Sequence, residues 1–255
     1  MKKNHILIFI SCSVLFMPSC KIMYTPNMQN VPLLKEKNEV RATVGFSDYQ
    51  AAYALTNNIG IMVNGQYKKP TWTLTSGSTE YKYESKKTLI EGGAGYFKPL
   101  GKNGIFETYA GGGMGSVTFD RSYSDTTGGP STSFDKYSAK TTRYFIQPSI
   151  GLSIENLDFA FSTRFVSLKF SNIDTAGYTP NGLFEQDLSD LDKTTYMFIE
   201  PALILRLGWK YVKFHFQALL SLPLNSEPIN FVPFSVNFGI HINIAPRYKN
   251  GTQPN

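Results

Sequence analysis

Cysteine, histidine and long apolar runs are scarce in this chain. Of its 255 residues, two are cysteine, three are histidine and only 17% carry a charged side chain. So few cysteines exclude a disulfide scaffold. No stretch of about 18 consecutive apolar residues follows the first 20 residues, which excludes a helical membrane protein. The net charge of +6 is weak and spread along the chain, so no nucleic acid is expected as a partner.

The first 20 residues have the pattern of an export signal. Two lysines precede an apolar stretch from Ile6 to Met17, which ends at a Pro-Ser pair. This stretch is too short to span a bilayer, and its charged start is typical of a signal peptide, here residues 1–19. The sequence Met17-Pro-Ser-Cys20 is similar to a bacterial lipobox and predicts a lipid on Cys20. The alternative is cleavage elsewhere, with Cys20 left unmodified.

Apolar and polar residues alternate along several stretches of about ten residues. Between Phe234 and Ile244 the even positions are apolar, and the odd positions are Ser, Asn, Gly or His. Similar alternation occurs over residues 144–154, 195–207 and 212–222. Successive side chains of a β-strand point to opposite faces, so each stretch has one apolar and one polar face. Strands of this length are typical of outer-membrane barrels, with lipid outside and a polar lumen.

These patterns predict an all-β fold: a closed antiparallel transmembrane up-and-down β-barrel of about 10 strands. The expected strands are residues 39–47, 49–56, 58–68, 87–98, 105–118, 141–155, 157–170, 194–208, 210–222 and 233–244. Short links alternate with long ones, and the long links span residues 69–86, 119–140, 171–193 and 223–232. Because bacterial barrels have short periplasmic turns and long extracellular loops, both termini are expected in the periplasm.

A soluble β-sandwich or barrel would also show alternation, with its apolar face buried in a core. Two features favour the membrane. The strands reach about 12 residues, which is long for a soluble sheet, and their polar faces carry glycine and isolated Arg or Glu rather than many lysines. We therefore expect Ile150, Phe161, Leu203 and Leu205 to face lipid, in the cell outer membrane.

Two stretches near the start of the mature chain resemble a known family. They read Tyr24-Thr-Pro-Asn-Met-Gln-Asn-Val-Pro-Leu33 and Ala51-Ala-Tyr-Ala-Leu-Thr-Asn-Asn-Ile-Gly-Ile-Met-Val-Asn-Gly65, with Glu36-Lys37 between them. Over residues 20–67 the chain is similar to outer-membrane β-barrel lipoproteins of Bacteroidota-type Gram-negative bacteria. The resemblance implies a fold and a location, and it supplies no site residues.

Seven charged residues occupy the polar faces of the expected strands and so point into the lumen: Arg41, Glu91, Glu107, Arg143, Arg164, Glu200 and Arg206. Charges of both signs in a narrow barrel are expected to pair and fill the lumen, because an unpaired buried charge is costly. The alternative is an ion-selective constriction. About ten strands lie close to the eight-stranded size that side chains fill, so a wide pore is not expected.

His215 and His241 lie on the polar faces of the last two expected strands. A hairpin would place them near each other, within reach of one metal ion, but two ligands do not make a site. Hydrogen-bonded histidines near the periplasmic end are the simpler interpretation. No other histidine follows the signal peptide to act as a base, so no enzyme activity, metal or cofactor is expected.

Three further patterns have structural interpretations. The glycine runs at 92–95 and 111–115 fall inside expected strands with no helix after them, which favours close packing over a phosphate loop. The acidic stretch at 171–193 matches no calcium-binding spacing and is expected to be a solvated loop. Aromatic residues alternate on both sides of Ser76-Gly77-Ser78, which predicts a hairpin that projects above the membrane.

The sequence thus predicts four regions: a lipoprotein-type signal peptide (1–19), a periplasmic N-terminal segment (20–37), an outer-membrane β-barrel (38–245) and a C-terminal tail (246–255). We expect a non-catalytic lipoprotein with a largely side-chain-filled lumen and a structural or loop-mediated binding role. The alternative function is a narrow channel for small solutes or ions. Expected partners are outer-membrane lipids and the barrel-assembly and lipoprotein-processing machinery.

Overall fold

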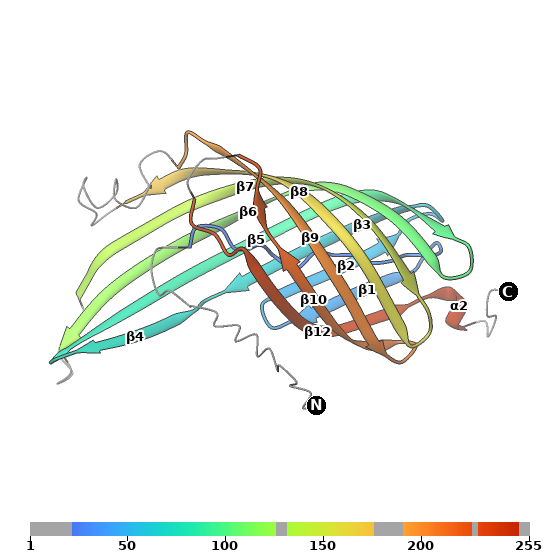
Figure 1. Cartoon of the computed structure of the whole chain (residues 1–255), viewed down its shortest axis with the longest axis horizontal. Helices are drawn as coiled ribbons and strands as arrows, with labels where there is room; N and C mark the ends of the chain where they lie inside the picture. The colour runs from blue at the N-terminus through green and yellow to red at the C-terminus, as the bar shows by residue number, and fades with distance from the viewer. Residues whose placement is uncertain (1–21, 126–131, 176–190, 226–228, 250–255) are drawn as a thin grey trace, which may run out of the picture.

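A computed structural model of the chain describes residues 22–125, 132–175, 191–225 and 229–249 (Figure 1). Almost all of its regular structure is β-strand. In chain order the elements are β1 (Val40–Gly45), β2 (Asp48–Ala54), β3 (Ile59–Lys68), β4 (Thr71–Ser76), β5 (Thr79–Leu100), β6 (Gly104–Asp125), β7 (Thr132–Ser153), β8 (Leu157–Asp174), β9 (Thr195–Gly208), β10 (Val212–Leu220), β11 (Leu222–Pro223), β12 (Phe234–Ile244) and the short helix α2 (Pro246–Lys249).

Ten of these strands form a closed ring. Strand β1 pairs with β2, and the order continues through β3, β5, β6, β7, β8, β9 and β10 to β12, which pairs with β1 again. Neighbouring strands in the ring are antiparallel. Closure removes the two free edges that an open sheet would expose. The predicted closed up-and-down barrel of about 10 strands is therefore confirmed.

An apolar belt surrounds the outer face of the ring. In β12 the even residues from Phe234 to Ile244 are all exposed, and Ile150, Phe161 and Leu203 are exposed on β7, β8 and β9. The intervening side chains point inward; on β12 they are Ser, Asn, Gly and His, whereas on β9 apolar side chains accompany Glu200 and Arg206. Such a belt corresponds to the apolar band of roughly 25 Å that outer-membrane barrels present to lipid.

The two ends of the barrel differ in their links. At one end, called the turn end, short links join β2 to β3, β5 to β6, β7 to β8 and β9 to β10. The opposite end, called the loop end, holds the remaining links. One of these, Phe46–Ser47 between β1 and β2, is short. Strand β1 ends at Gly45, which pairs with Gly239 of β12, so residues 234–238 of β12 pair with β10 alone. The barrel wall is therefore low at the loop end of β1.

Strands β5, β6 and β7 have 22 residues each, whereas β10 and β12 have 9 and 11. The wall therefore extends much further at the loop end on one side of the ring (Figure 1). The expected loops at 69–86 and 119–140 are wrong over most of their length, because they are strands. Beyond the belt the outward residues no longer need to be apolar, so the alternation that identifies the strands disappears from the sequence there.

The predicted projecting hairpin is confirmed. Strand β4 pairs with the first part of β5 across a turn in which Gly77 has a φ of 61°, a left-handed conformation that glycine adopts without strain. Trp72 lies opposite Tyr83, and their rings stack with centroids 5.5 Å apart. The guanidinium of Arg121, on the neighbouring strand β6, lies 5.3 Å from the centroid of the Tyr83 ring.

The glycine runs bring neighbouring strands close together. The runs at 92–95 and 111–115 face each other across β5 and β6, where Gly92 pairs with Gly112 and Gly93 with Gly111. A Cβ atom at Gly111 would collide with the carbonyl oxygen of Gly92. No helix follows either run, so the structure supports the close-packing interpretation.

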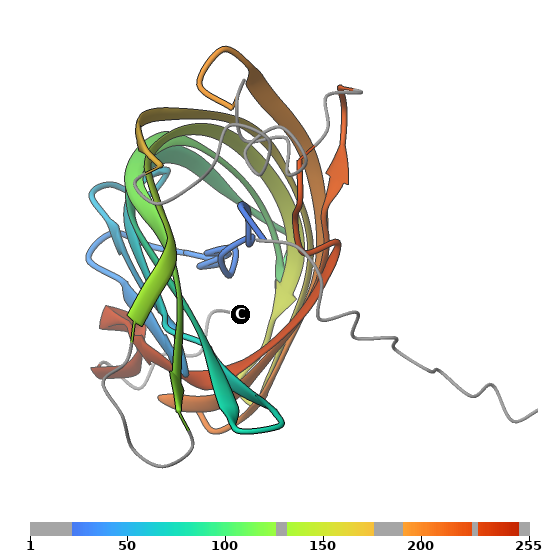
Figure 2. The same ribbon diagram turned by 90° about the vertical axis from the view of Figure 1, so that its left-hand side faces the viewer.

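Residues 22–39, called the N-terminal segment, lead into β1. The sequence alone suggests that residues 20–37 are periplasmic, whereas the structure places residues 22–34 inside the ring, where most of them are buried (Figure 2). The difference arises because the segment has side chains and backbone groups that match the polar inner wall, as described below. The lumen is thus filled by a stretch of backbone as well as by side chains.

The assignment of the two faces can be tested with a charge on the belt. Leu203→Arg places a cation among exposed apolar side chains and should cost about 2–4 kcal/mol at the bilayer midplane. Thr195→Arg, on the same face of β9 but at its loop end, is the matched control. We expect Leu203→Arg to reduce the folded fraction in lipid vesicles, measured by heat-modifiable gel mobility, and Thr195→Arg to leave it unchanged. Equal folding of both variants would contradict the lipid-facing assignment.

Candidate functional site in the barrel lumen

The inner wall holds the backbone of the N-terminal segment by side-chain hydrogen bonds. The Met28 amide donates to Asp48 Oδ1 at 2.9 Å, and the Met28 carbonyl accepts from Gln50 Nε2 at 2.7 Å. Gln217 bonds both the amide and the carbonyl of Gln29, at 2.8 and 3.0 Å. Polar side chains of the barrel thus replace the partners that a neighbouring strand would otherwise supply.

These contacts continue towards the turn end. The carbonyl of Asn30 accepts from Gln147 Nε2 at 2.7 Å, and that of Val31 accepts from Arg206 Nη2 at 2.8 Å. The Leu33 amide donates to Glu107 Oε2 at 2.9 Å. Strands β2, β3, β5, β6, β7, β8, β9 and β10 all contribute side chains that bond this segment. The segment is therefore anchored around nearly the whole ring.

Four of the predicted lumen charges form a central cluster: Glu91, Arg143, Arg164 and Glu200. Arg164 lies 2.7 Å from Glu200 and 3.5 Å from Glu91, measured between charged atoms. Arg143 lies 3.6 Å from Glu200 and 3.7 Å from Glu91. Two cations face two anions, so the cluster is balanced in charge, which is the condition for burying such groups without a large penalty.

The N-terminal segment completes the central cluster. Asn27 donates from Nδ2 to Glu91 at 2.8 Å and accepts at Oδ1 from Arg143 at 2.6 Å, while its carbonyl accepts from Arg164 at 3.0 Å. The hydroxyl of Tyr24 donates to Glu200. One amide side chain therefore bonds one anion and one cation of the cluster at the same time.

A second group, the turn-end cluster, consists of Glu39, Arg41, Asp158, Arg206 and Lys213. Asp158 is its centre, with Lys213 at 2.7 Å, Arg41 at 3.5 Å and Arg206 at 3.7 Å. Glu39 pairs with Arg41 at 2.8 Å and also accepts from Arg247 of α2. Through Arg247 the C-terminal helix is tied to the residue that precedes β1.

All seven charges that the sequence suggests for the lumen are buried there: Arg41, Glu91, Glu107, Arg143, Arg164, Glu200 and Arg206. Six of them lie in the two clusters. Glu107 differs, because the partner shown for its carboxylate is the Leu33 amide rather than an arginine. This glutamate serves to hold the N-terminal segment.

Sequence reasoning missed several lumen residues. Asp158 and Lys213 are fully buried members of the turn-end cluster, and strand alternation could have placed them inward, since each follows an outward residue at a strand start. Tyr24, Asn27 and Gln29 carry no such signal, because they precede the first strand and follow no two-residue period.

The two strand histidines lie on adjacent strands and face inward, and both are buried. His215 accepts at Nδ1 from Arg206 Nε at 3.0 Å, and His241 Nδ1 lies 2.9 Å from the Thr43 hydroxyl. Within the described residues no group of three or more His, Cys, Asp or Glu side chains could hold a metal ion. Both histidines lie towards the turn end, where the hydrogen-bond network includes them.

A small cavity remains beside the N-terminal segment, with a volume of about 40 Å³. Its lining includes Tyr24, Thr25, Lys87 and Arg143. Lys87 Nζ donates to the Thr25 hydroxyl at 2.7 Å. The cavity is large enough for a few water molecules and too small for an organic solute.

We expect the central cluster to depend on its charge balance. Glu200→Gln removes one anion and leaves Arg164 and Arg143 partly uncompensated in a buried site, so it should lower the free energy of unfolding by about 3–5 kcal/mol. The matched control is Glu155→Gln in the exposed β7–β8 turn, which should change it by less than about 0.5 kcal/mol. Urea unfolding in detergent micelles measures both. Equal stability of the two variants would show that the cluster is dispensable.

The turn-end cluster should make stability acid-sensitive. Burial alone would raise the pKa of Glu39, but the charges of Arg41 and Arg247 and their hydrogen bonds hold it at about 2, below its ordinary value of 4.5. A depressed carboxylate pKa stabilises the fold above pH 4.5 and loses this effect as the pH falls towards 2. The difference in melting temperature between the wild type and Glu39→Gln should be constant above about pH 5 and shrink towards pH 2. A difference independent of pH would refute this role.

Comparisons with known proteins give a similarity of structure and none of sequence. No protein-family model matches the chain, and no curated protein matches its sequence. Among solved structures it is similar to the outer membrane protease OmpT from Escherichia coli, with 11% sequence identity and a TM-score of 0.42. The alignment covers 81% of this chain and 92% of that one. At this level the similarity carries no information about the site.

Proposed function

We propose that this chain is a non-catalytic outer-membrane lipoprotein whose barrel is sealed by its own N-terminal segment and whose loop end binds a ligand at the cell surface. The observation that carries the proposal is the occupied lumen. A backbone stretch crosses it and is hydrogen-bonded by eight of the ring strands. A lumen filled in this way supports a structural role.

The location is supported by the outer face. The closed ring pairs the backbone groups of its strands, as lipid requires. The exposed apolar belt and the short links at one end are further features of outer-membrane barrels. Because bacterial barrels have short periplasmic turns and long extracellular loops, the proposal places the turn end in the periplasm and the loop end outside the cell. The lipoprotein part of the proposal is supported by Met17-Pro-Ser-Cys20.

The absence of catalysis is supported by where the reactive groups lie. The buried carboxylates of the two clusters bond arginine, lysine or the N-terminal segment. The two strand histidines are fixed in the same network towards the turn end. A general base needs a substrate within hydrogen-bond reach, and the burial of these groups in the lumen disfavours such access.

The loop-end extension supports a binding role. Strands β4, β5 and β6 carry Trp72, Tyr83 and Arg121 next to one another, in a stack that lies beyond the apolar belt. The Trp72 side chain is 41% exposed. Aromatic rings with a guanidinium beside them form a flat face that suits planar or sugar-like ligands.

Planar-bilayer conductance tests the sealed lumen. We expect no conductance steps from the wild-type protein, and steps from a variant that lacks residues 23–33, because this deletion removes the segment that fills the ring. Heat-modifiable mobility shows whether the deletion variant folds. Steps from the wild type would refute the seal and favour the alternative function, a narrow channel for small solutes or ions. Should the deletion variant not fold, the double substitution Asn27→Gly and Gln29→Gly, which removes two side chains of the segment that bond the wall, is the gentler test of the same expectation.

A further inference from the structure

The contacts at the two ends of the N-terminal segment show in which direction it runs along the barrel axis. At its start, the amides of Met23 and Tyr24 donate to the carbonyl of Asn230 at 2.8 and 3.2 Å, and the Tyr24 carbonyl accepts from Val232 at 3.0 Å. Tyr24 also forms a parallel β-bridge with Phe231. Residues 229–232 belong to the link between β10 and β12 at the loop end. The segment therefore begins at the loop end.

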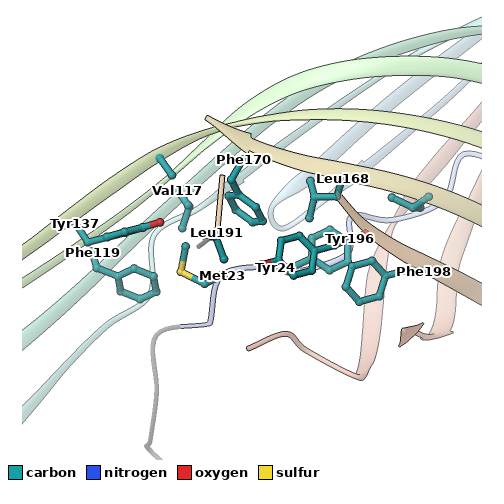
Figure 3. Packing of buried hydrophobic residues seen from close by; sticks show 12 residues of the cluster. Met23, Tyr24, Val117, Phe119, Tyr137, Leu168, Phe170, Leu191, Tyr196 and Phe198 are labelled. Carbon is teal, nitrogen blue, oxygen red and sulfur yellow. The ribbon is translucent and has the colours of Figure 1, made fainter. Parts of the chain in front are cut away.

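Apolar packing also holds the start of the N-terminal segment. Met23 and Tyr24 pack in a buried cluster with side chains of β6 to β9 (Figure 3), among them Phe119, Tyr137 and Phe170. The Tyr24 ring stacks on Phe198 with centroids 4.6 Å apart. The members on β6 and β7 lie in the parts of those strands towards the loop end, so the cluster holds Met23 and Tyr24 on the loop-end side of the lumen.

The other end of the segment lies at the turn end. Lys35 Nζ donates to the carbonyl of Ser153, the last residue of β7, at 2.6 Å. The Asn38 amide donates to the carbonyl of Ala54, the last residue of β2, at 2.9 Å. The segment thus crosses the lumen from the loop end to the turn end before it turns into β1. This direction contradicts the expectation that both termini lie on the periplasmic side.

We propose that the mature N-terminus lies at the cell surface and that a lipid on Cys20 is inserted in the outer leaflet of the outer membrane. The proposal rests on the function proposed above for the orientation of the barrel and for the lipid. Cys20 is three residues from Met23, a separation of at most about 10 Å. The apolar belt is roughly 25 Å high. A lipid on Cys20 therefore cannot reach the inner leaflet while Met23 is held at the loop end.

The low part of the wall lies where such a lipid is needed. Met23 is bonded to the β10–β12 link, beside the place where the neighbouring strand β1 ends at Gly45 and the wall is low. Leu222, Leu224 and Phe234 at this rim are exposed, with 42%, 52% and 57% of their surface accessible. Acyl chains attached near Met23 can pass this rim and lie against these apolar side chains.

Protease accessibility on intact cells tests the proposal. A site for a sequence-specific protease is inserted between Lys21 and Ile22, with matched insertions at Ser78 in the β4–β5 turn and between Glu155 and Asn156 in the β7–β8 turn. We expect added protease to cut the first two sites on intact cells and the third only after the cells are permeabilised. Cutting at Ser78 without cutting at Lys21 would overturn the surface location of the N-terminus. Cutting at Asn156 instead of Ser78 would show that the orientation of the barrel, and with it the proposed function, is wrong.

Fatty-acid labelling tests the lipid separately. After cleavage at Lys21 on intact cells, the label should stay with the short N-terminal fragment and leave the barrel unlabelled. Cys20→Ala should abolish the label, while the Lys21 site stays accessible as far as the variant is exported. A label that remains on the barrel after cleavage, or that persists in Cys20→Ala, would overturn the assignment of the lipid to Cys20.

Discussion

The structure depends on the hydrogen bonding of a peptide segment by the inner wall of a barrel. A ring of ten strands encloses a space that is shielded from water, and in that space each polar group needs a partner. The N-terminal segment supplies amides, carbonyls and the side chains of Tyr24, Asn27 and Gln29, and the wall supplies complementary groups. Without this match the charged inner wall would face a void.

The charges are arranged in two levels along the barrel axis. The central cluster balances two arginines against two glutamates and binds the segment through Asn27. The turn-end cluster gathers three cations around Asp158 and connects through Glu39 to the C-terminal helix. The first level holds the segment in the lumen, and the second joins the start of the barrel to the end of the chain. Both therefore use ion pairs to connect parts that are distant in sequence.

How far the sequence predicts the fold depends on where lipid constrains it. Within the belt, each outward residue must be apolar, so stretches such as Phe234 to Ile244 identify their strands directly. Beyond the belt this constraint ends, and neither the continuation of β6 past residue 118 nor the part of β7 before residue 141 can be read from periodicity. The inward charges follow from the same alternation, which explains why Arg143 and Glu200 are predictable. The position of Asn27 is not, because a segment without regular structure is placed by its partners rather than by its own pattern.

The pairing of β1 with β12 and the N-terminal segment that precedes β1 limit the order in which the barrel can assemble. Strand β1 forms one side of the seam with β12, the last strand in the chain, so the ring cannot close until the whole chain is present. A finished ring would admit the segment only end first, and the lipid proposed on Cys20 would have to pass a narrow lumen. Closure around a segment already in place avoids this barrier. Closure of the seam between β1 and β12 is thus the step that traps the segment inside, and afterwards the segment can leave only end first along the lumen or through an opened seam.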